Sequence, residues 1–162
     1  ALDGSPSLDI TTPEEILLAQ AGTMISLATT SSSLGLASLL SLTINSRYKM
    51  LKSLVSSILL PYMIEDISKY KSAKIVKLAK IMKCIPENEE ETLGDAEICK
   101  YFVDSLRERI AKANLPTRLK DLNLTIEQLS LAVEDVKQID SVKTLPRSMS
   151  TDDIFDFIKL AY

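Results

Sequence analysis

The sequence predicts an all-α protein, a multi-helix bundle. Four glycines, six prolines and 5% aromatic residues in 162 argue against a β-sandwich. Apolar residues recur at four-residue steps at positions 98, 102, 106 and 110, and no stretch shows the alternation of a half-buried strand. We expect a single helical domain over residues 1–162, with residues 1–12 as a flexible lead-in.

Start signals and breaks divide this domain into helices. Thr12 precedes Pro13, which suits the first helical position, and Thr125 and Ser150 precede their helices as capping residues. A proline inside a helix removes a donor, so we expect an interruption or kink near Pro61. The segment 34–45 is so apolar that we expect it to be central and buried nearly all round. The expected helices span residues 13–29, 34–45, 51–70, 72–82 and 95–113, with two more beginning at Thr125 and Ser150.

Charge is distributed unevenly along the chain. Residues 16–46 contain no charged side chain, but their eleven serines and threonines interrupt any membrane span, and we expect two buried helices that meet at a polar turn. Residues 47–83 contain nine bases and two acids within a chain of net charge -3. The basic segment is most simply a solvated helix face, although a lysine stripe can also contact an acidic partner.

The absence of histidine excludes several chemistries. Without imidazole there is no Ser-His-Asp or Cys-His catalytic arrangement and no histidine-containing zinc site. Cys84 and Cys99 lack metal or redox spacing and are expected to be reduced thiols of a cytoplasmic protein. The acidic balance predicts no nucleic-acid partner, and no membrane partner is expected.

Neither the adjacent carboxylates nor the tyrosines show a specific catalytic pattern. Glu65 and Asp66 are adjacent on a helix and therefore point in different directions, so solvated charge is favoured over paired catalysis. Tyr48, Tyr62 and Tyr101 offer hydrogen-bonding hydroxyls, and nothing in their spacing selects one of them.

A set of short motifs in the last fifty residues resembles the C-terminus of the iron-containing (group III) alcohol dehydrogenases. Their order and spacing together are specific, whereas each alone is weak. They are Asn-Leu-Pro-Thr-Arg-Leu at 114–119, Leu-Asn-Leu at 122–124, Leu-Pro-Arg at 145–147, Thr-Asp-Asp-Ile at 151–154 and Ala-Tyr at 161–162.

The resemblance extends upstream and fixes a register. Leu-Gly-Leu at 34–36 and Ile-Leu-Leu-Pro at 58–61 match two family anchors without a gap. In that register Ser38 stands at the family's first metal-binding histidine, Leu42 at a further active-site histidine and Lys52 at the second metal-binding histidine. The family's other two metal ligands, an aspartate and a histidine, belong to an earlier part that this chain does not contain.

The resemblance implies a dehydroquinate synthase-like helical C-terminal domain of an oxidoreductase that uses a divalent metal, iron or zinc, and NAD(P). The N-terminal Rossmann-like nucleotide-binding domain is absent from this chain, and the start at Ala1 without methionine favours a fragment. With Ser38, Leu42 and Lys52 in place of histidine, we expect a lost metal site. We also expect no catalytic, cofactor-binding or metal-ligating residue, and an inactive domain.

Two alternatives stay open. The chain is a structural or protein-interaction domain whose partner is its own N-terminal nucleotide-binding domain or a second copy in a homo-oligomer. This alternative predicts an exposed apolar patch. In the second alternative, the chain is a fragment of a metal-independent NAD(P)-linked oxidoreductase, and Lys52 supplies the positive charge that the metal ion supplies in the family.

Overall fold

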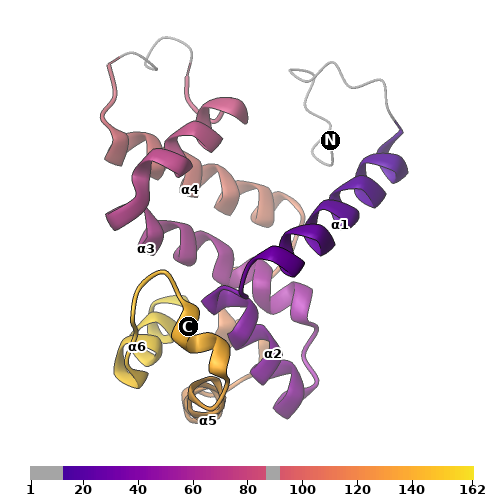
Figure 1. Cartoon of the computed structure of the whole chain (residues 1–162), viewed down its shortest axis with the longest axis vertical. Coiled ribbons are helices and arrows are strands. Elements are labelled where there is room, and N and C mark those ends of the chain that lie inside the picture. The colour runs from indigo at the N-terminus through magenta and orange to yellow at the C-terminus, as the bar shows by residue number, and fades with distance from the viewer. Residues whose placement is uncertain (1–12, 87–91) are drawn as a thin grey trace. The chain divides into compact units, whose positions relative to one another are not determined.

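The computed structural model describes residues 13–86 and 92–162, and throughout these two stretches the regular structure is helical, which confirms the predicted fold class (Figure 1). The expected lead-in over residues 1–12 lies outside the described residues, as does the acidic run at 89–91. The chain forms two compact units, Ala1–Leu34 and Gly35–Tyr162. The helices are α1 (Glu14–Ser31), α2 (Leu36–Tyr48), α3 (Lys52–Ile81), α4 (Asp95–Lys112), α5 (Ile126–Lys137) and α6 (Thr151–Ala161), with 3₁₀ turns η1 (Leu119–Leu122) and η2 (Asp140–Thr144).

Helix α1 is the regular element of the first unit. Its hydroxyls bond back to its own carbonyl oxygens, as Thr23 does to Ala19 at 2.9 Å and Ser26 to Gly22 at 3.0 Å. Such bonds satisfy the hydroxyls locally. The expectation that this helix is buried is wrong, because Met24 is 71% exposed and Ile25 and Leu27 are each 65% exposed. The helix begins at Glu14 and not at Pro13, because the ψ of 143° at Pro13 is extended.

The break between α1 and α2 falls at residues 32–35, where the sequence predicts a polar turn. Among the described residues, no single helix is both long and apolar enough to cross a membrane. One bent pair, Glu15–Ser31 with Leu36–Tyr48, passes that test when taken together, by length and composition only.

Helix α2 supplies much of the core of the second unit. Leu39, Leu40 and Ile44 are fully buried, and the helix contacts both α3 and α5. The expectation of burial nearly all round is wrong at Leu42, whose side chain is 37% exposed. The apolar stripe faces the neighbouring helices, and Leu42 lies off that stripe.

Helix α3 runs through Pro61 without a break. Pro61 is buried and keeps helical backbone angles, whereas Lys71 has non-helical angles of φ -140° and ψ 49°. The expected interruption at Pro61 is therefore wrong, because the φ that the proline ring imposes is compatible with a helix that gives up one hydrogen bond. The break falls instead between the two helices predicted over 51–70 and 72–82.

The second half of α3 packs against α4 (Figure 1). A cluster that includes Ile75, Ala79, Ile98 and Phe102 is buried between them. Leu78, predicted on the same face, is 41% exposed. The lysines lie on the exposed side, as the amphipathic pattern predicts: Lys74, Lys77, Lys80 and Lys83.

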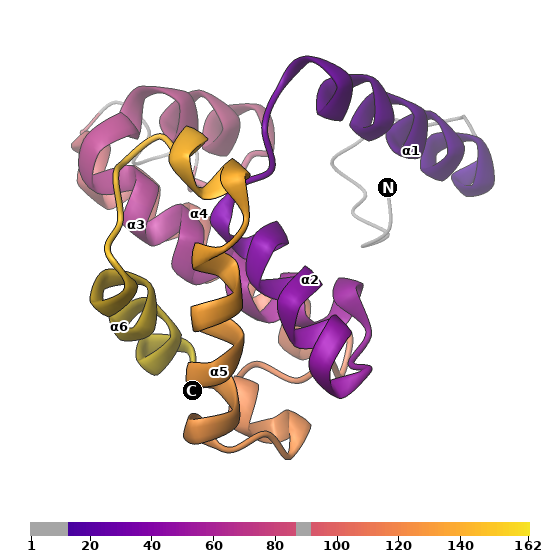
Figure 2. The same cartoon turned by 60° about the horizontal axis from the view of Figure 1, so that its bottom comes forward.

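The C-terminal third places α5 beside both α2 and α6 (Figure 2). The predicted caps are confirmed, because Thr125 Oγ1 accepts the N–H of Gln128 and Ser150 Oγ accepts the N–H of Asp153. The hydroxyl of Tyr48 donates to the carbonyl oxygen of Gln128 at 2.8 Å and so joins α2 to α5.

Candidate functional site

The structure places the three family positions on α2 and at the start of α3. Ser38 and Leu42 lie one turn apart on α2, and therefore on one face of it. Lys52 is the first residue of α3, is exposed, and forms no ion pair with any described residue. The backbone rises about 15 Å between Ser38 and Tyr48. Ser38 thus lies near the first residue of α2, whereas Lys52 follows the last residue of that helix, Tyr48, by four positions.

The chemistry of these side chains does not fit a divalent cation. Protein ligands for iron or zinc are imidazole, thiolate and carboxylate groups. Ser38 offers a neutral hydroxyl, Leu42 offers no donor atom, and the ammonium group of Lys52 repels a cation. Over residues 13–86 and 92–162, no group of three or more acidic or cysteine side chains is placed to hold a metal.

The two cysteines are free thiols, as predicted. Cys99 is buried in the α3–α4 cluster, and this burial, with a contribution from Asp95, raises the pKa of its thiol. A raised pKa lowers the fraction of reactive thiolate. Cys99 therefore serves packing and is not an activated nucleophile.

A charged cavity of about 840 Å³ lies among α3, α4, α6 and the segment before η1. It holds four basic and four acidic side chains, so its formal charges balance. Three further residues complete the wall, including the ring of Tyr62. The lining consists of Tyr62, Glu65, Asp66, Lys69, Arg107, Arg118, Arg147, Asp153, Asp156, Phe157 and Leu160.

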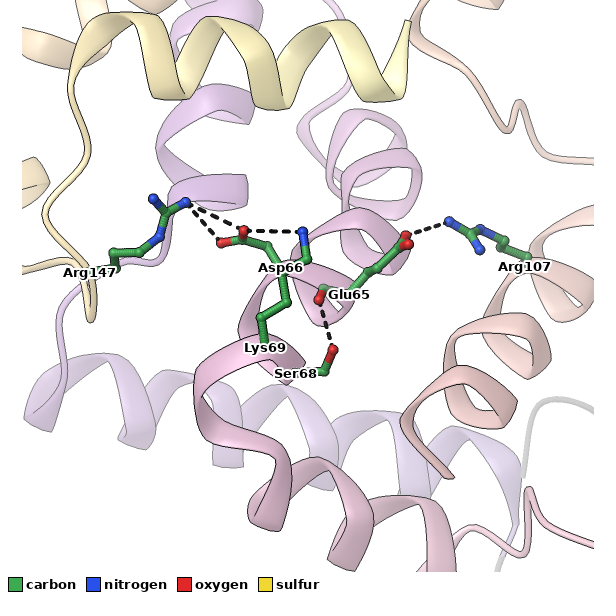
Figure 3. A network of polar contacts seen from close by, with 6 residues as sticks. All are labelled: Glu65, Asp66, Ser68, Lys69, Arg107 and Arg147. Atoms are coloured by element: carbon green, nitrogen blue, oxygen red, sulfur yellow. Dashed lines mark hydrogen bonds and ion pairs between the residues drawn. The ribbon is translucent and has the colours of Figure 1, made fainter. Parts of the chain in front are cut away.

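Three ion pairs join residues that line this cavity, and one of them is the contact of 3.9 Å between Lys69 Nζ and Asp66 Oδ1 (Figure 3). Arg107 Nη2 lies 2.9 Å from Glu65 Oε2, and Arg147 Nη2 lies 3.2 Å from Asp66 Oδ2. The adjacent carboxylates point in different directions, as predicted, but each is paired and not simply solvated. Sequence spacing could not show this, because the partners are 42 and 81 residues away.

Two guanidinium groups lie beside the ring of Tyr62. The Cζ atoms of Arg107 and Arg118 lie 5.4 Å and 5.8 Å from the centre of its ring, within the range of cation–π attraction. Arg118 stands inside one of the C-terminal motifs, yet its place beside Tyr62 comes only from the fold.

Two solved protein structures share this helical fold. A 1,3-propanediol oxidoreductase superposes with a TM-score of 0.70 at 17% identity, over 80% of this chain and 33% of that one. An alcohol dehydrogenase from Oenococcus oeni gives a TM-score of 0.70 at 21% identity, with the same coverage of both chains. The chain thus shares its helical fold with part of each of these two proteins, and it spans about a third of their length.

The family assignment comes from the sequence match. Residues 6–162 match the model of the Fe-containing alcohol dehydrogenase family, C-terminal. The chain belongs to this family and forms its C-terminal domain. No curated protein matches the sequence.

Proposed function

We propose that this chain is the helical domain of an alcohol dehydrogenase-type protein that has lost the divalent metal site and does not transfer hydride by itself. The observation that supports the proposal is the donor set at Ser38, Leu42 and Lys52. In the resembled family, the ion polarises the alcohol or carbonyl oxygen during hydride transfer. A hydroxyl, an isobutyl group and an ammonium group do not hold such an ion.

The nucleotide requirement supports the same conclusion. The resemblance assigns NAD(P) binding to a Rossmann-like domain, which needs a strand followed by a glycine-rich turn and a helix. Within the described ranges of this chain the elements are helices and 3₁₀ turns. The chain therefore functions as the helical partner of such a domain.

Metal binding tests the proposal directly. The full chain is equilibrated with Fe²⁺ or Zn²⁺, freed of excess ion, and measured by elemental analysis alongside a Ser38→Ala/Lys52→Ala variant. We expect substoichiometric metal and equal values for both proteins. Stoichiometric metal in the wild type that the double variant loses would contradict the proposal, and a Cys84→Ser variant serves as control for thiol-bound ion.

Protein interaction is a second candidate function, and α1 favours it. Met24 is 71% exposed, and Ile25 and Leu27 are each 65% exposed. Large apolar side chains that gather on an exposed surface are typical of a contact with another protein. The partner we propose is the N-terminal nucleotide-binding domain of the same protein or a second copy of the chain.

Measurements of association in solution test this second candidate function. Light scattering or ultracentrifugation of the chain, alone and with a family nucleotide-binding domain, should show association that Ile25→Glu weakens. Leu131→Glu, at a 43% exposed position on α5, is the matched control. A monomer that binds no such domain, or equal loss in both variants, would count against an interaction surface on α1.

A further inference from the structure

Two cavities meet at Arg118, Arg107 and Tyr62, which line both of them. One is the charged cavity of about 840 Å³, and the other is a smaller cavity of about 380 Å³. Apolar groups dominate the smaller one. Its other lining residues are Ile58, Pro61, Glu108, Ile110, Ala111 and Thr117.

The acids and the other bases of the charged cavity already have partners. Glu65 pairs with Arg107, and Asp66 pairs with both Arg147 and Lys69. Of the two remaining acids, one caps α6 by accepting from Ser150 and the other pairs with Lys159: Asp153 and Asp156. Among the four bases of the lining, Arg118 is therefore the one without an ion pair to a described carboxylate, and among the acids Asp153 is bonded to the hydroxyl and N–H of Ser150 and not to a base.

Arg118 has a guanidinium group with unused donors. Its Nη1 donates to the carbonyl oxygen of Leu160 at 3.0 Å, and its Cζ lies 5.8 Å from the centre of the Tyr62 ring, but it forms no ion pair with a described carboxylate. The nearby Asp121 accepts the backbone N–H of Arg118 and not the guanidinium. Since a guanidinium has five N–H donors, most of them remain for a ligand.

The charge and shape of this junction select a class of ligand. A guanidinium without an ion pair binds a carboxylate with two parallel hydrogen bonds, and its single positive charge matches the single negative charge of a carboxylate better than the double charge of a phosphate dianion. The neighbouring apolar walls at Ile58, Pro61 and Ile110 suit a short hydrocarbon tail. Glu108, the acidic group of that cavity, is paired with Lys112 at 3.9 Å.

We propose that the junction of the two cavities binds a small aliphatic monocarboxylate, with its carboxylate on Arg118 and its tail in the cavity lined by Ile58, Pro61 and Ile110. A volume of about 380 Å³ lies within the ordinary range of small-molecule pockets, roughly 300 to 1,000 Å³. This site lies on α3, α4 and the segment before η1, apart from Ser38 and Leu42 on α2. It is independent of whether the chain holds a metal.

Titration of the full chain with sodium octanoate, followed by ligand-observed NMR and calorimetry, tests the proposal. We expect binding to the wild type at millimolar concentration, and a loss of about tenfold or more in Arg118→Gln, because a charged hydrogen-bonded pair is removed. Lys120→Gln, two residues away on η1 and outside both cavities, should bind like the wild type. Circular dichroism of each variant verifies its fold.

Comparison ligands and a second variant separate the contribution of the carboxylate to binding from that of the hydrocarbon tail. Ala111→Phe, at an exposed position lining the apolar cavity, should weaken octanoate binding without touching Arg118. Octanol, acetate and inorganic phosphate should all bind more weakly than octanoate. Equal binding of octanoate to Arg118→Gln, phosphate binding as tight as octanoate, or no octanoate binding by the wild type would each overturn the proposal.

Discussion

Truncation of Ile158 to alanine tests the packing of α6 against the rest of the second unit. Ile158 is fully buried, and α6 contacts α5 and α3. The substitution removes three carbon groups, which costs about 2.4 kcal/mol in transfer free energy at ~0.8 kcal/mol each. The cavity left behind adds to this cost, so we expect a loss of roughly 3 to 4 kcal/mol in the free energy of unfolding.

The assay is urea unfolding followed by far-UV circular dichroism, with the slope of the transition fitted for each protein. Leu160→Ala is the matched control, because Leu160 lies two residues away on α6 and is 61% exposed. It should change the free energy of unfolding by less than about 0.5 kcal/mol. The reasoning is refuted if Ile158→Ala costs under about 1 kcal/mol, or if the control costs as much.

Three further predictions concern a cap, an ion pair and the thiols. Ser150→Ala removes the side-chain cap of α6 and should lower the free energy of unfolding by about 1 kcal/mol in the same urea assay. Hydrogen bonds from Arg47 lower the pKa of the Asp135 carboxyl, so the pair stabilises the fold above the ordinary aspartate pKa and loses this effect as pH falls through the lowered value. Thermal unfolding of Asp135→Asn should therefore depend less on pH in the acidic range, and an unchanged pH profile would contradict this. Cys84, which is half-buried, should react with a thiol reagent before the buried Cys99, and the reverse order would contradict the burial.

The sequence was sufficient to predict those features of the fold that depend on residues close together in the chain. The helix caps at Thr125 and Ser150 were predictable because a capping box joins residues that are only three positions apart. The periodicity of the second half of α3 likewise predicted which side faces α4, with Ile75 and Ala79 buried. The break at Lys71 was predicted as the boundary between helices at 51–70 and 72–82. Only the additional interruption near Pro61 was wrong, because a proline permits either a break or a continuous helix.

Of the candidate functional residues, some could be identified from the sequence and others only from the structure. Ser38, Leu42 and Lys52 were identified from motif spacing, since aligned anchors determine a register without any structure. The charged cavity could not be found in this manner, because Glu65 and Asp66 meet arginines far along the chain.

The sequence alone determined the helical class, the family resemblance and the absence of histidine, because composition, short-range periodicity and motif order are properties of the chain itself. Only the tertiary structure decided which charged groups form ion pairs, and that Arg118 forms none with a described carboxylate. Arg118 comes to lie beside Tyr62 and Leu160 through the packing of α3 and α6, and no spacing rule in one dimension reports a contact made in three.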